Sequence, residues 1–553
     1  MLWTRKILAH EGKTSSKQNH VRLFLGFGLW VFTATEMQAG DVITVSYPFL
    51  GVSHITRAGS APDFPRNVKL HVVKIDLRAP SLSFKFTPHS GTRDTFRQTT
   101  LQYLNDMGAQ VAINGAFFSP FPSADFNAAL IGFAASNGNV YSPFELPNQN
   151  YAIVRDAPSI NIDPHNNASV VHRDPAYSDG TCYGMCQAVD GLHVLEKVTL
   201  WNTFSGSAQI VTNGVKTIPC YLDASHPDCP LIGPGPANYS NSNSWYERVN
   251  ARTAIGLSCD SKTLVLFTVD AANGSSGMRV SEVADLLIRD YAVCNALNMD
   301  GGGSTSLAIR DPVTGIGRLV NSSSDNPNGR ANASGLAVFA ARDTEPPHTT
   351  AKVTPAPNMN GWNNSDVTVS LNAQDNPGGI VKQVEYSVTG AQPSGAQEAA
   401  GKTASLHLVS EGLTTIHYFA TDFAGNREAS RSLTIKIDKT RPVISGMPAA
   451  GCTLWPPNRE LVQVATVTAT DVLSGLEAGS LTVTGSSNEL IDPNDPAIVI
   501  KPTGSGQFIV QIQAHRLENG AGRTYTLTAT ATDLAGNVAT STATCIVPHD
   551  QVK

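Results

Sequence analysis

Three apolar segments in the N-terminal half of the sequence end abruptly in polar residues or glycine. They are Val111-Ala-Ile-Asn114, Leu264-Val-Leu-Phe-Thr-Val-Asp270 and Ala296-Leu-Asn-Met-Asp300, and the last continues as Gly301-Gly302-Gly303-Ser304-Thr305. A glycine run after a buried strand is entropically costly, so it indicates a sharp turn or the close approach of a ligand. The backbone N–H groups of such a turn can bind an anion such as phosphate. Ser304 or Thr305 would add a hydroxyl donor, and Asp300 would lie at the entrance of the site.

Each candidate residue also has an ordinary structural explanation. Glycine runs are common turn signals, and Asp270 fits a loop cap as well as a site carboxylate. Glu282 lies where a predicted helix begins, so it either favours the helix dipole or faces a cleft. Arg252 precedes an apolar run and fits a surface ion pair or a bidentate phosphate contact. Asn114 fits a turn or a hydrogen bond to a sugar or phosphate oxygen.

Two helices and several strands must position these residues. One helix is predicted from Thr99 to Met107, ended by Gly108. The other is predicted from Val280 to Tyr291, with apolar residues recurring at i, i+3, i+4 and i+7. Apolar runs at 68–77, 109–114, 264–270 and 296–300 predict strands, and the polar, glycine-rich region between predicts long loops. We therefore expect an α+β domain from about residue 41 to 343.

Taken together, the motifs resemble the phosphodiester glycosidase family over about residues 65–341. The segments that carry the resemblance occur in the family's order: Asn114-Gly-Ala-Phe-Phe118, Arg252-Thr-Ala-Ile-Gly256, Asp270, Glu282-Val-Ala284 and Asn298-Met-Asp-Gly-Gly-Gly-Ser304. Two positions depart from the family pattern. Ala116 replaces a second glycine, and Ala271-Ala272-Asn273 follows Asp270 where the family often has Gly-Arg.

The resemblance implies hydrolysis of a sugar-1-phosphodiester to a free sugar and a phosphomonoester. It implies that Asp300, Glu282 and Asp270 supply the base, acid or nucleophile, in an order that the sequence leaves open. It implies that Asn114, Arg252, Asn298, Gly301, Gly302, Gly303, Ser304 and Thr305 bind the substrate. No cofactor or metal is expected. The alternatives are a non-catalytic surface glycan-binding protein and a metal-dependent phosphodiesterase, although the histidines show no ligand spacing.

The composition narrows the class of partner. The chain has 553 residues, which is too many for one hydrophobic core, so several domains are expected. Its formal net charge is -6, which disfavours a nucleic-acid partner because such partners favour basic patches. The expected partner is therefore a glycan or sugar phosphodiester.

The N-terminus and the cysteines indicate export. Basic residues precede the apolar run Leu23–Phe32, and Met37-Gln-Ala39 resembles a cleavage site, so residues 1–39 are predicted to be a signal peptide. No later stretch is apolar enough to span a membrane. Eight cysteines, six in the first domain, favour disulfides over a zinc site at Cys182-x3-Cys186. A secreted, cell-surface or periplasmic location is expected.

Two all-β modules are predicted to follow the first domain. Residues 344–438 and 439–549 alternate apolar and polar residues, and both resemble extracellular immunoglobulin-like β-sandwiches. The segment Ala420-Thr-Asp-Phe-Ala-Gly-Asn426 recurs as Ala531-Thr-Asp-Leu-Ala-Gly-Asn537, which predicts equivalent hairpins. A disulfide between Cys452 and Cys545 is expected to join the first and last strands of the second module. The modules are expected to act as spacers or to contact surface polysaccharide.

Overall fold

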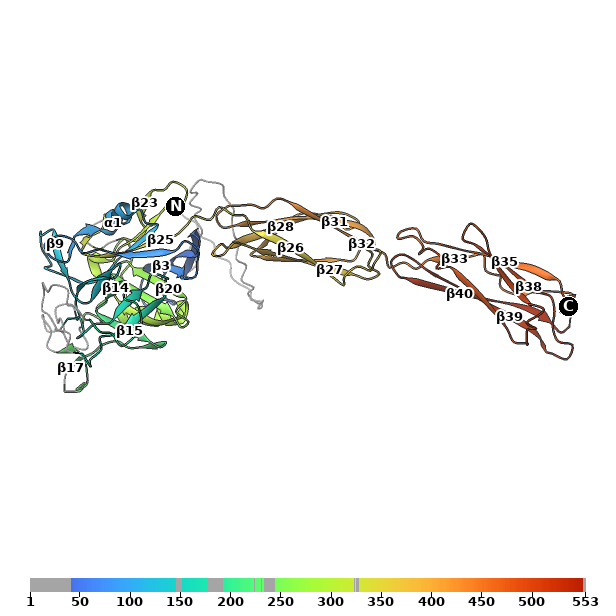
Figure 1. The fold of residues 1–553 in the computed structure, drawn as a ribbon, viewed down its shortest axis with the longest axis horizontal. Helices are drawn as coiled ribbons and strands as arrows, with labels where there is room; N and C mark the ends of the chain where they lie inside the picture. The colour runs from blue at the N-terminus through green and yellow to red at the C-terminus, as the bar shows by residue number, and fades with distance from the viewer. Residues whose placement is uncertain are drawn as a thin grey trace, which may run out of the picture.

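The computed structural model describes residues 41–145, 152–177, 192–222, 224–229, 231–232, 244–322, 324 and 328–550. The predicted signal peptide and the pair Cys182 and Cys186 lie outside these residues. Figure 1 shows an elongated molecule with three units in a row. The first contains β1 to β25, the second β26 to β32 and the third β33 to β40.

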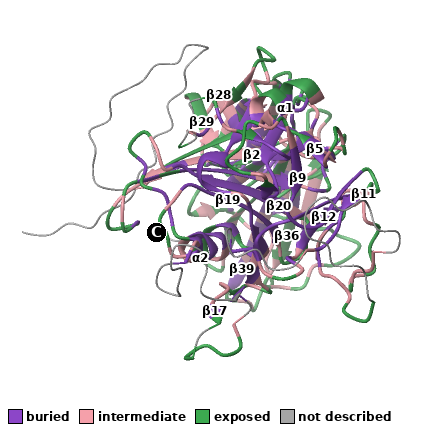
Figure 2. Cartoon of the chain, turned by 90° about the vertical axis from the view of Figure 1, so that its left-hand side faces the viewer, coloured by how far each residue is buried: buried purple, intermediate pink, exposed green. Residues whose placement is uncertain are grey.

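A central antiparallel sheet organises the first unit. Its eight strands run in the order β1-β2-β3-β20-β19-β21-β15-β16. They are β1 (Val42–Phe49), β2 (Val52–Gly59), β3 (Val68–Asp76), β20 (Thr263–Val269), β19 (Arg252–Ser258), β21 (Val293–Asn298), β15 (Ala208–Thr212) and β16 (Val215–Lys216). Figure 2 shows β19 and β20 buried within the unit.

Alternate residues of the central strands enter two different cores. Leu264 and Leu266 of β20 belong to one hydrophobic cluster, whereas Val265, Phe267 and Val269 belong to another. Because successive side chains of a strand point to opposite faces, both faces of the sheet are covered. This explains why the segment is apolar without interruption instead of alternating.

Two five-stranded sheets complete this unit on one side. The first has the order β23-β22-β7-β25-β4, and the second has the order β11-β10-β14-β12-β13. The first consists of β23 (Gly317–Leu319), β22 (Leu307–Arg310), β7 (Val111–Asn114), β25 (Gly335–Phe339) and β4 (Ser83–Phe86). The second consists of β11 (Asn139–Ser142), β10 (Ala134–Ser136), β14 (Asn202–Ser205), β12 (Ser159–Ile162) and β13 (Ala168–Val171). Both contribute to the core that contains Leu264 and Leu266.

These strands correct the prediction of long loops between the helices. The polar, glycine-rich region instead contains many strands, several of only two to four residues. A small sheet of β5 (Thr95–Phe96), β9 (Asn127–Leu130) and β8 (Phe118–Ser119) is one further example. Such short strands show little periodicity in sequence and are held by tertiary pairing.

The two predicted helices are present, and they are the α-helices of the described residues. α1 (Thr100–Met107) begins after Thr99, whose side chain accepts from the Gln102 backbone, and it ends at the left-handed Gly108. α1 packs on the sheet that contains β7. α2 (Val280–Tyr291) buries Val280, Val283, Ala284 and Leu287 in the second core of the central sheet. The described part of the protein is therefore mostly β, and both of its α-helices lie in the first unit.

The second and third units each contain two sheets around one hydrophobic core. In the second unit the sheets are β26-β27-β30 and β29-β28-β31-β32. Their bounds are β26 (His348–Thr354), β27 (Val367–Gln374), β28 (Val381–Gly390), β29 (Ser394–Ala400), β30 (Thr403–Leu408), β31 (Gly412–Asp422) and β32 (Arg431–Ile437).

The third unit is built from the sheets β33-β35-β38-β37 and β34-β40-β39-β36. The bounds are β33 (Val443–Ser445), β34 (Cys452–Thr453), β35 (Leu461–Thr470), β36 (Thr482–Ser487), β37 (Ile498–Pro502), β38 (Phe508–Gln513), β39 (Gly522–Thr532) and β40 (Val538–Pro548). The disulfide Cys452–Cys545 joins β34 to β40 and confirms the predicted pairing.

Two more disulfides, Cys220–Cys229 and Cys259–Cys294, lie in the first unit. Disulfides persist in oxidising compartments. No helix among the described residues is long and apolar enough to cross a membrane.

Candidate active site

Antiparallel pairing brings four of the predicted residues to one edge of the central sheet. Arg252 begins β19 and pairs with Val269, the last residue of β20, so Asp270 follows at the same edge. Ala254 of β19 pairs with Asn298, the last residue of β21. The chain that leaves β21 therefore carries Asp300 to this edge.

A pocket of about 360 Å³ opens beside Asp300. Its volume is within the range of small-ligand sites, roughly 300–1,000 Å³. The lining consists of Phe117, Phe118, Phe121, Trp245, Asn250, Asp300, Gly301, Gly302, Gly303, Ser324 and Arg330. Aromatic rings, one carboxylate and one guanidinium thus face the same space.

Asp300 is the only carboxylate among the described residues that line this pocket. Burial raises the pKa of Asp300 to about 7. Hydrogen bonds from the Ser304 hydroxyl and the Gly301 backbone, together with the charge of Arg330, offset part of this increase. A carboxyl group with a pKa near neutrality can accept or donate a proton at physiological pH.

The glycine run after Asp300 makes the predicted sharp turn. Gly302 has a φ of 61°, in the left-handed region that favours glycine. Its N–H donates to the Ala251 carbonyl at 2.9 Å, and the Ser304 N–H donates to the Gly301 carbonyl at 3.2 Å. Because these two N–H groups are occupied, the predicted anion cradle is at most partly available to a ligand. The turn lets the backbone approach the pocket closely.

Asn114 lies behind the turn instead of in the pocket lining. It is fully buried at the end of β7. Its Nδ2 donates to the Asp300 carbonyl at 2.7 Å. Its Oδ1 accepts from the Thr253 hydroxyl at 2.9 Å and the Ser306 N–H at 3.0 Å. The side chain therefore fixes the Asp300 loop, and its hydrogen-bonding capacity is largely used within the protein.

Arg252 is also buried behind the pocket. Its Nε donates to the Met278 carbonyl at 3.1 Å, and its Nη2 donates to the carbonyls of Trp245 and Arg248. Its guanidinium lies over the Trp245 ring, 4.9 Å from the centroid. Burial lowers the pKa of Arg252 to about 9. Nη1 alone has no hydrogen-bond partner among the described residues, so Arg252 holds Trp245 in place and offers at most this one nitrogen to a ligand.

Asp270 and Glu282 lie outside the lining of this pocket. Asp270 Oδ1 accepts from Asn321 Nδ2 and the Ser322 N–H, both at 3.1 Å, and burial raises the pKa of Asp270 to about 6. Glu282 forms a bidentate ion pair with Arg66 and accepts from the Arg279 N–H. Burial alone would raise the pKa of Glu282, but the bonds from Arg66 and Arg279 lower it below its ordinary value. Asp300 therefore faces the pocket, whereas Asp270 and Glu282 form hydrogen bonds and ion pairs with neighbouring loops.

Three other predicted binding residues are buried. Asn298 Nδ2 donates to Ser207 Oγ at 2.9 Å. Ser304 lies between Asp300 and Arg330, whose Nη1 donates to Ser304 Oγ at 3.2 Å. Thr305 is fully buried, and its hydroxyl has no hydrogen-bond partner among the described residues. Ser304 contacts three residues of the pocket lining, namely Asp300, Gly301 and Arg330.

Part of the chain matches the model of a known protein family. Residues 107–339 match the family model described as phosphodiester glycosidase. These residues form a phosphodiester glycosidase domain.

Several solved structures resemble the chain distantly. The catalytic domain of zebrafish N-acetylglucosamine-1-phosphodiester alpha-N-acetylglucosaminidase is 19% identical, with a TM-score of 0.37, and the match covers 54% of this chain and 88% of that one. A hypothetical protein from Synechocystis is 16% identical with a TM-score of 0.35, over 52% and 62% of the two chains. A Burkholderia pseudomallei protein described as exported is 12% identical with a TM-score of 0.40, over 55% and 97%. No curated protein matches the chain.

The phosphodiester glycosidase domain accommodates the methyl group of Ala116, whereas the preceding position, Gly115, is too crowded for a side chain. A Cβ on the preceding residue, Gly115, would lie 2.8 Å from Ser334 Oγ and 3.0 Å from the Phe86 ring, so that position requires glycine. The Ala116 N–H donates to Ser334 Oγ at 3.0 Å, and its methyl group is buried. The substitution therefore leaves the turn that precedes Phe117 and Phe118 intact.

The sequence predicted Asp300 and the three glycines of the pocket lining as site residues, but not the other seven lining residues. Arg330 lies 4.3 Å from the centroid of Phe121 and contacts Ser304, but it is in an Asn- and Gly-rich segment without periodicity. Trp245 lies in a similar segment, and its buried indole N–H has no hydrogen-bond partner in the part of the chain that the structure describes. The only local signal was Phe117-Phe118, which belongs to the family motif. Tertiary structure alone places the other residues here.

Proposed function

We propose that this chain is an exported hydrolase that cleaves a sugar-1-phosphodiester to the free sugar and a phosphomonoester. The observation that carries the proposal is the pocket of the phosphodiester glycosidase domain, in which Asp300, Arg330 and four aromatic rings share one space. Aromatic faces suit the apolar face of a sugar ring, and a guanidinium suits a phosphate. The first substrate to consider is N-acetylglucosamine-1-phosphodiester, which the zebrafish relative's name states.

Arg330 is the proposed phosphate-binding residue of the site. Its guanidinium lies over Phe121 and beside Ser304, so it is oriented by two contacts at the pocket wall. Its charge would neutralise the phosphodiester and stabilise the phosphomonoester as it leaves. Arg252, the residue predicted from sequence, supports this arrangement through Trp245 and contributes at most its Nη1.

Asp300 is the proposed general base. It accepts a proton from a water molecule whose oxygen attacks the anomeric carbon, while the bond between that carbon and the phosphate oxygen breaks with its electron pair on the oxygen. The proton then passes to solvent. The phosphate is already a good leaving group, so a second carboxyl group acting as an acid is unnecessary. A direct attack by water inverts the anomeric configuration.

The remaining predicted residues take positioning roles in this proposal. Asn114 fixes the Asp300 carbonyl, and Asp270 holds the loop at 321–322. Glu282 holds the start of α2 through Arg66 and the Arg279 N–H.

Export is part of the proposal and rests on two features. The predicted signal peptide at residues 1–39 precedes a chain with disulfides in its first and third units. The two β units would then act outside the cytoplasm as spacers or contact cell-surface polysaccharide.

The test is hydrolysis of a panel of α-sugar-1-phosphodiesters, led by UDP-N-acetylglucosamine and a methyl-phosphate ester, by residues 40–553. Free reducing sugar is the expected product, and proton NMR should detect the β anomer first. Asp300→Asn should abolish turnover, whereas Asp106→Asn, which changes an exposed aspartate on α1, should not.

Other products would overturn specific parts of the proposal. Release of sugar phosphate would show cleavage of a P–O bond by a phosphodiesterase. Initial release of the α anomer would show retention, with Asp300 as a nucleophile. Binding of the panel without turnover would identify a glycan-binding protein.

A further inference from the structure

Two groups of three aspartates lie where successive units of the chain meet. The first group is Asp343, Asp375 and Asp422, and the second is Asp438, Asp471 and Asp533. Within each group, one oxygen from each residue lies within 4.8 Å of the others. Neither group lines the pocket of the glycosidase domain.

The two groups are built on the same local pattern. Asp422 and Asp533 occupy the same place in the repeated Ala-Thr-Asp segments. Each accepts hydrogen bonds from the backbone N–H and the Nδ2 of an asparagine four residues later, all at 2.8 Å. Asp375 and Asp471 each follow a strand and precede a glycine by four residues, Gly379 and Gly475. The arrangement therefore occurs twice.

Each group takes aspartates from both sides of a joint. At the first joint, Asp343 follows the last strand of the first unit, whereas Asp375 and Asp422 belong to the second unit. The same joint is closed by a hydrogen bond from the Gly51 N–H to the Gly378 carbonyl at 2.9 Å. The rings of Tyr47 and Phe423 also meet there, with centroids 4.5 Å apart.

The second joint repeats this composition. Asp438 follows β32 of the second unit, whereas Asp471 and Asp533 belong to the third. Asn537 Nδ2 donates to the Asp438 carbonyl at 2.9 Å, and the Ser474 N–H donates to Asp438 Oδ2 at 2.9 Å. A cation bound by all three carboxylates of a group would connect the adjacent units at that joint.

Two of the three carboxylates of the first joint are buried, and the described residues provide no compensating cation. Asp343 is 8% exposed and Asp422 is 1% exposed. Among the described residues, no lysine, arginine or histidine forms an ion pair with either of them or with Asp375. Buried charges are ordinarily paired or bind metals, so a missing cation is indicated.

Two buried oxygen atoms of the first joint, Asp375 Oδ2 and Asn376 Oδ1, have no hydrogen-bond partner among the described residues. Both lie close to Gly379, where a Cβ would be 2.8 Å from the first and 2.3 Å from the second. Asp343 accepts hydrogen bonds at Oδ1, from Asn376 Nδ2 and the Glu345 N–H, and the described residues donate none to its Oδ2.

We propose that the first joint binds a Ca²⁺ ion through Asp343, Asp375 and Asp422, and that the second joint binds another through Asp438, Asp471 and Asp533. All of the available ligands are oxygens, which hard cations prefer, and neither group contains the nitrogen or sulfur ligands typical of zinc. Ca²⁺ suits these groups better than Mg²⁺ because it accepts irregular sets of carboxylates from separate segments, whereas Mg²⁺ demands near-ideal octahedral geometry.

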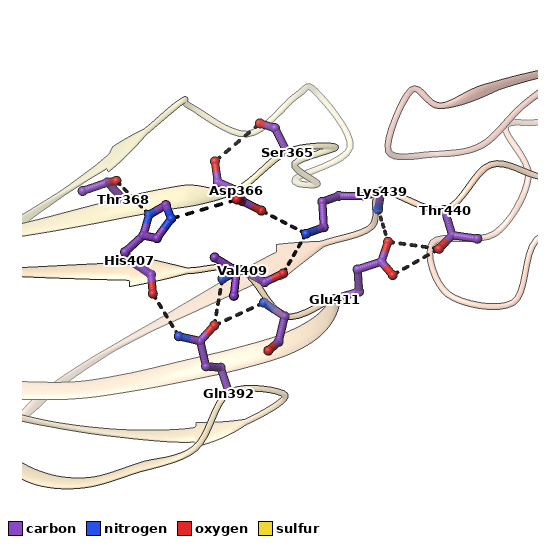
Figure 3. A network of polar contacts seen from close by, with 10 residues as sticks. Ser365, Asp366, Thr368, Gln392, His407, Val409, Glu411, Lys439 and Thr440 are labelled. Carbon is purple, nitrogen blue, oxygen red and sulfur yellow. Dashed lines mark hydrogen bonds and ion pairs between the residues drawn. The ribbon is translucent and has the colours of Figure 1, made fainter.

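The ions would stiffen the chain at both joints. Figure 3 shows that the segment after Asp438 is already fixed on its second-unit side. Lys439 Nζ donates to Asp366 Oδ1 at 2.9 Å and to the Val409 carbonyl at 2.8 Å, and the Thr440 hydroxyl donates to Glu411. An ion on Asp438 would connect this fixed segment to the third unit. The second and third units would then hold the glycosidase domain at a defined distance from the C-terminus of the chain.

The experiment measures Ca²⁺ bound to residues 40–553 by equilibrium dialysis after chelator treatment. The expected stoichiometry is two ions per chain, with dissociation constants on the order of 10⁻⁴ to 10⁻³ M, as in other extracellular modules. Asp422→Asn and Asp533→Asn should each lower the stoichiometry to one, and the double variant to zero. Glu398→Gln changes an exposed carboxylate of β29 and should leave it at two.

Shape and folding measurements complete the test. Small-angle X-ray scattering should give a longer maximum dimension for the wild-type chain with Ca²⁺ than with chelator. Circular dichroism checks that each variant folds, and Asp375→Asn replaces Asp422→Asn if the latter does not. No Ca²⁺ binding by the folded wild type, or a stoichiometry unchanged in the double variant, would overturn the proposal. Because the assay needs no substrate, its outcome is independent of the proposed hydrolysis.

Discussion

The start of α2 and the loop after β21 place two predicted catalytic carboxylates in opposite surroundings. Glu282 at the start of α2 is paired with Arg66 and a backbone N–H, and its pKa is lowered. Asp300 after β21 forms no such ion pair with the described residues, faces a pocket and has a pKa raised to about 7. A carboxylate that the protein itself neutralises stabilises the fold, whereas one held at high pKa beside a cavity is ready for proton transfer. The surroundings therefore favour a structural role for Glu282 and a catalytic role for Asp300.

The sharpest test of this difference substitutes both carboxylates by their amides. Asp300→Asn should lower kcat/KM by about 10²- to 10⁴-fold, because the amide cannot accept the proton of the attacking water. Glu282→Gln should retain activity within a few fold of wild type. The measurement is steady-state hydrolysis of the best substrate in the panel. Equal losses in both variants would contradict the distinction.

Arg330 offers the next largest effect, because it is the guanidinium that shares the pocket with Asp300. Arg330→Gln should raise KM about ten- to a hundredfold for a charged phosphodiester, the range expected for a lost hydrogen bond to a charged group. Arg318→Gln, at an exposed arginine of β23, provides the control. A KM equal to that of the control would remove Arg330 from the phosphate site.

The sequence predicts the local parts of this comparison well. The helix from Val280 to Tyr291 and the turn after Asp300 follow from patterns within a few residues, namely amphipathic spacing, a capping glutamate and a glycine run. What sequence could not predict is the partner of each charge. Arg66 is 216 residues from Glu282, and Arg330 reaches Ser304 from an irregular segment. The sequence alone therefore could not distinguish the structural role of Glu282 from the catalytic role of Asp300.

The same limit applies to the tail. The repeated Ala-Thr-Asp segments are visible in sequence, and they predict equivalent hairpins. Asp343 and Asp438 carry no such signal, because they join the repeated aspartates only where two units meet. The short strands between residues 118 and 222 were missed for a related reason, since their pairing partners lie in distant segments.

The pH dependence of the reaction distinguishes the two carboxylates in a third way. Because Asp300 acts as a base, kcat/KM should fall about tenfold for each pH unit below its raised pKa of about 7 and should be level above it. Glu282, whose pKa is lowered, stays ionised over this range and should leave the profile unchanged on substitution. A profile level down to pH 5 in the wild type would exclude Asp300 as the base.

The smallest effect concerns stability. Glu282→Gln should lower the free energy of unfolding of the first unit by about 1 kcal/mol, because glutamine retains an acceptor for the Arg279 N–H but loses the ion pair with Arg66. The folded-state pKa of Glu282 is depressed, so the wild-type contribution is present above the pKa of the unfolded chain and is lost as the pH falls through the folded value. The difference in unfolding temperature between the two proteins should therefore be largest near neutral pH and disappear in acid.

Asp300→Asn should show the opposite sign near neutral pH, since it removes a charge that burial disfavours, and its unfolding temperature should equal or exceed that of the wild type. Calorimetry of both variants at two pH values tests whether the carboxylate that stabilises the fold and the one that serves the reaction are different residues.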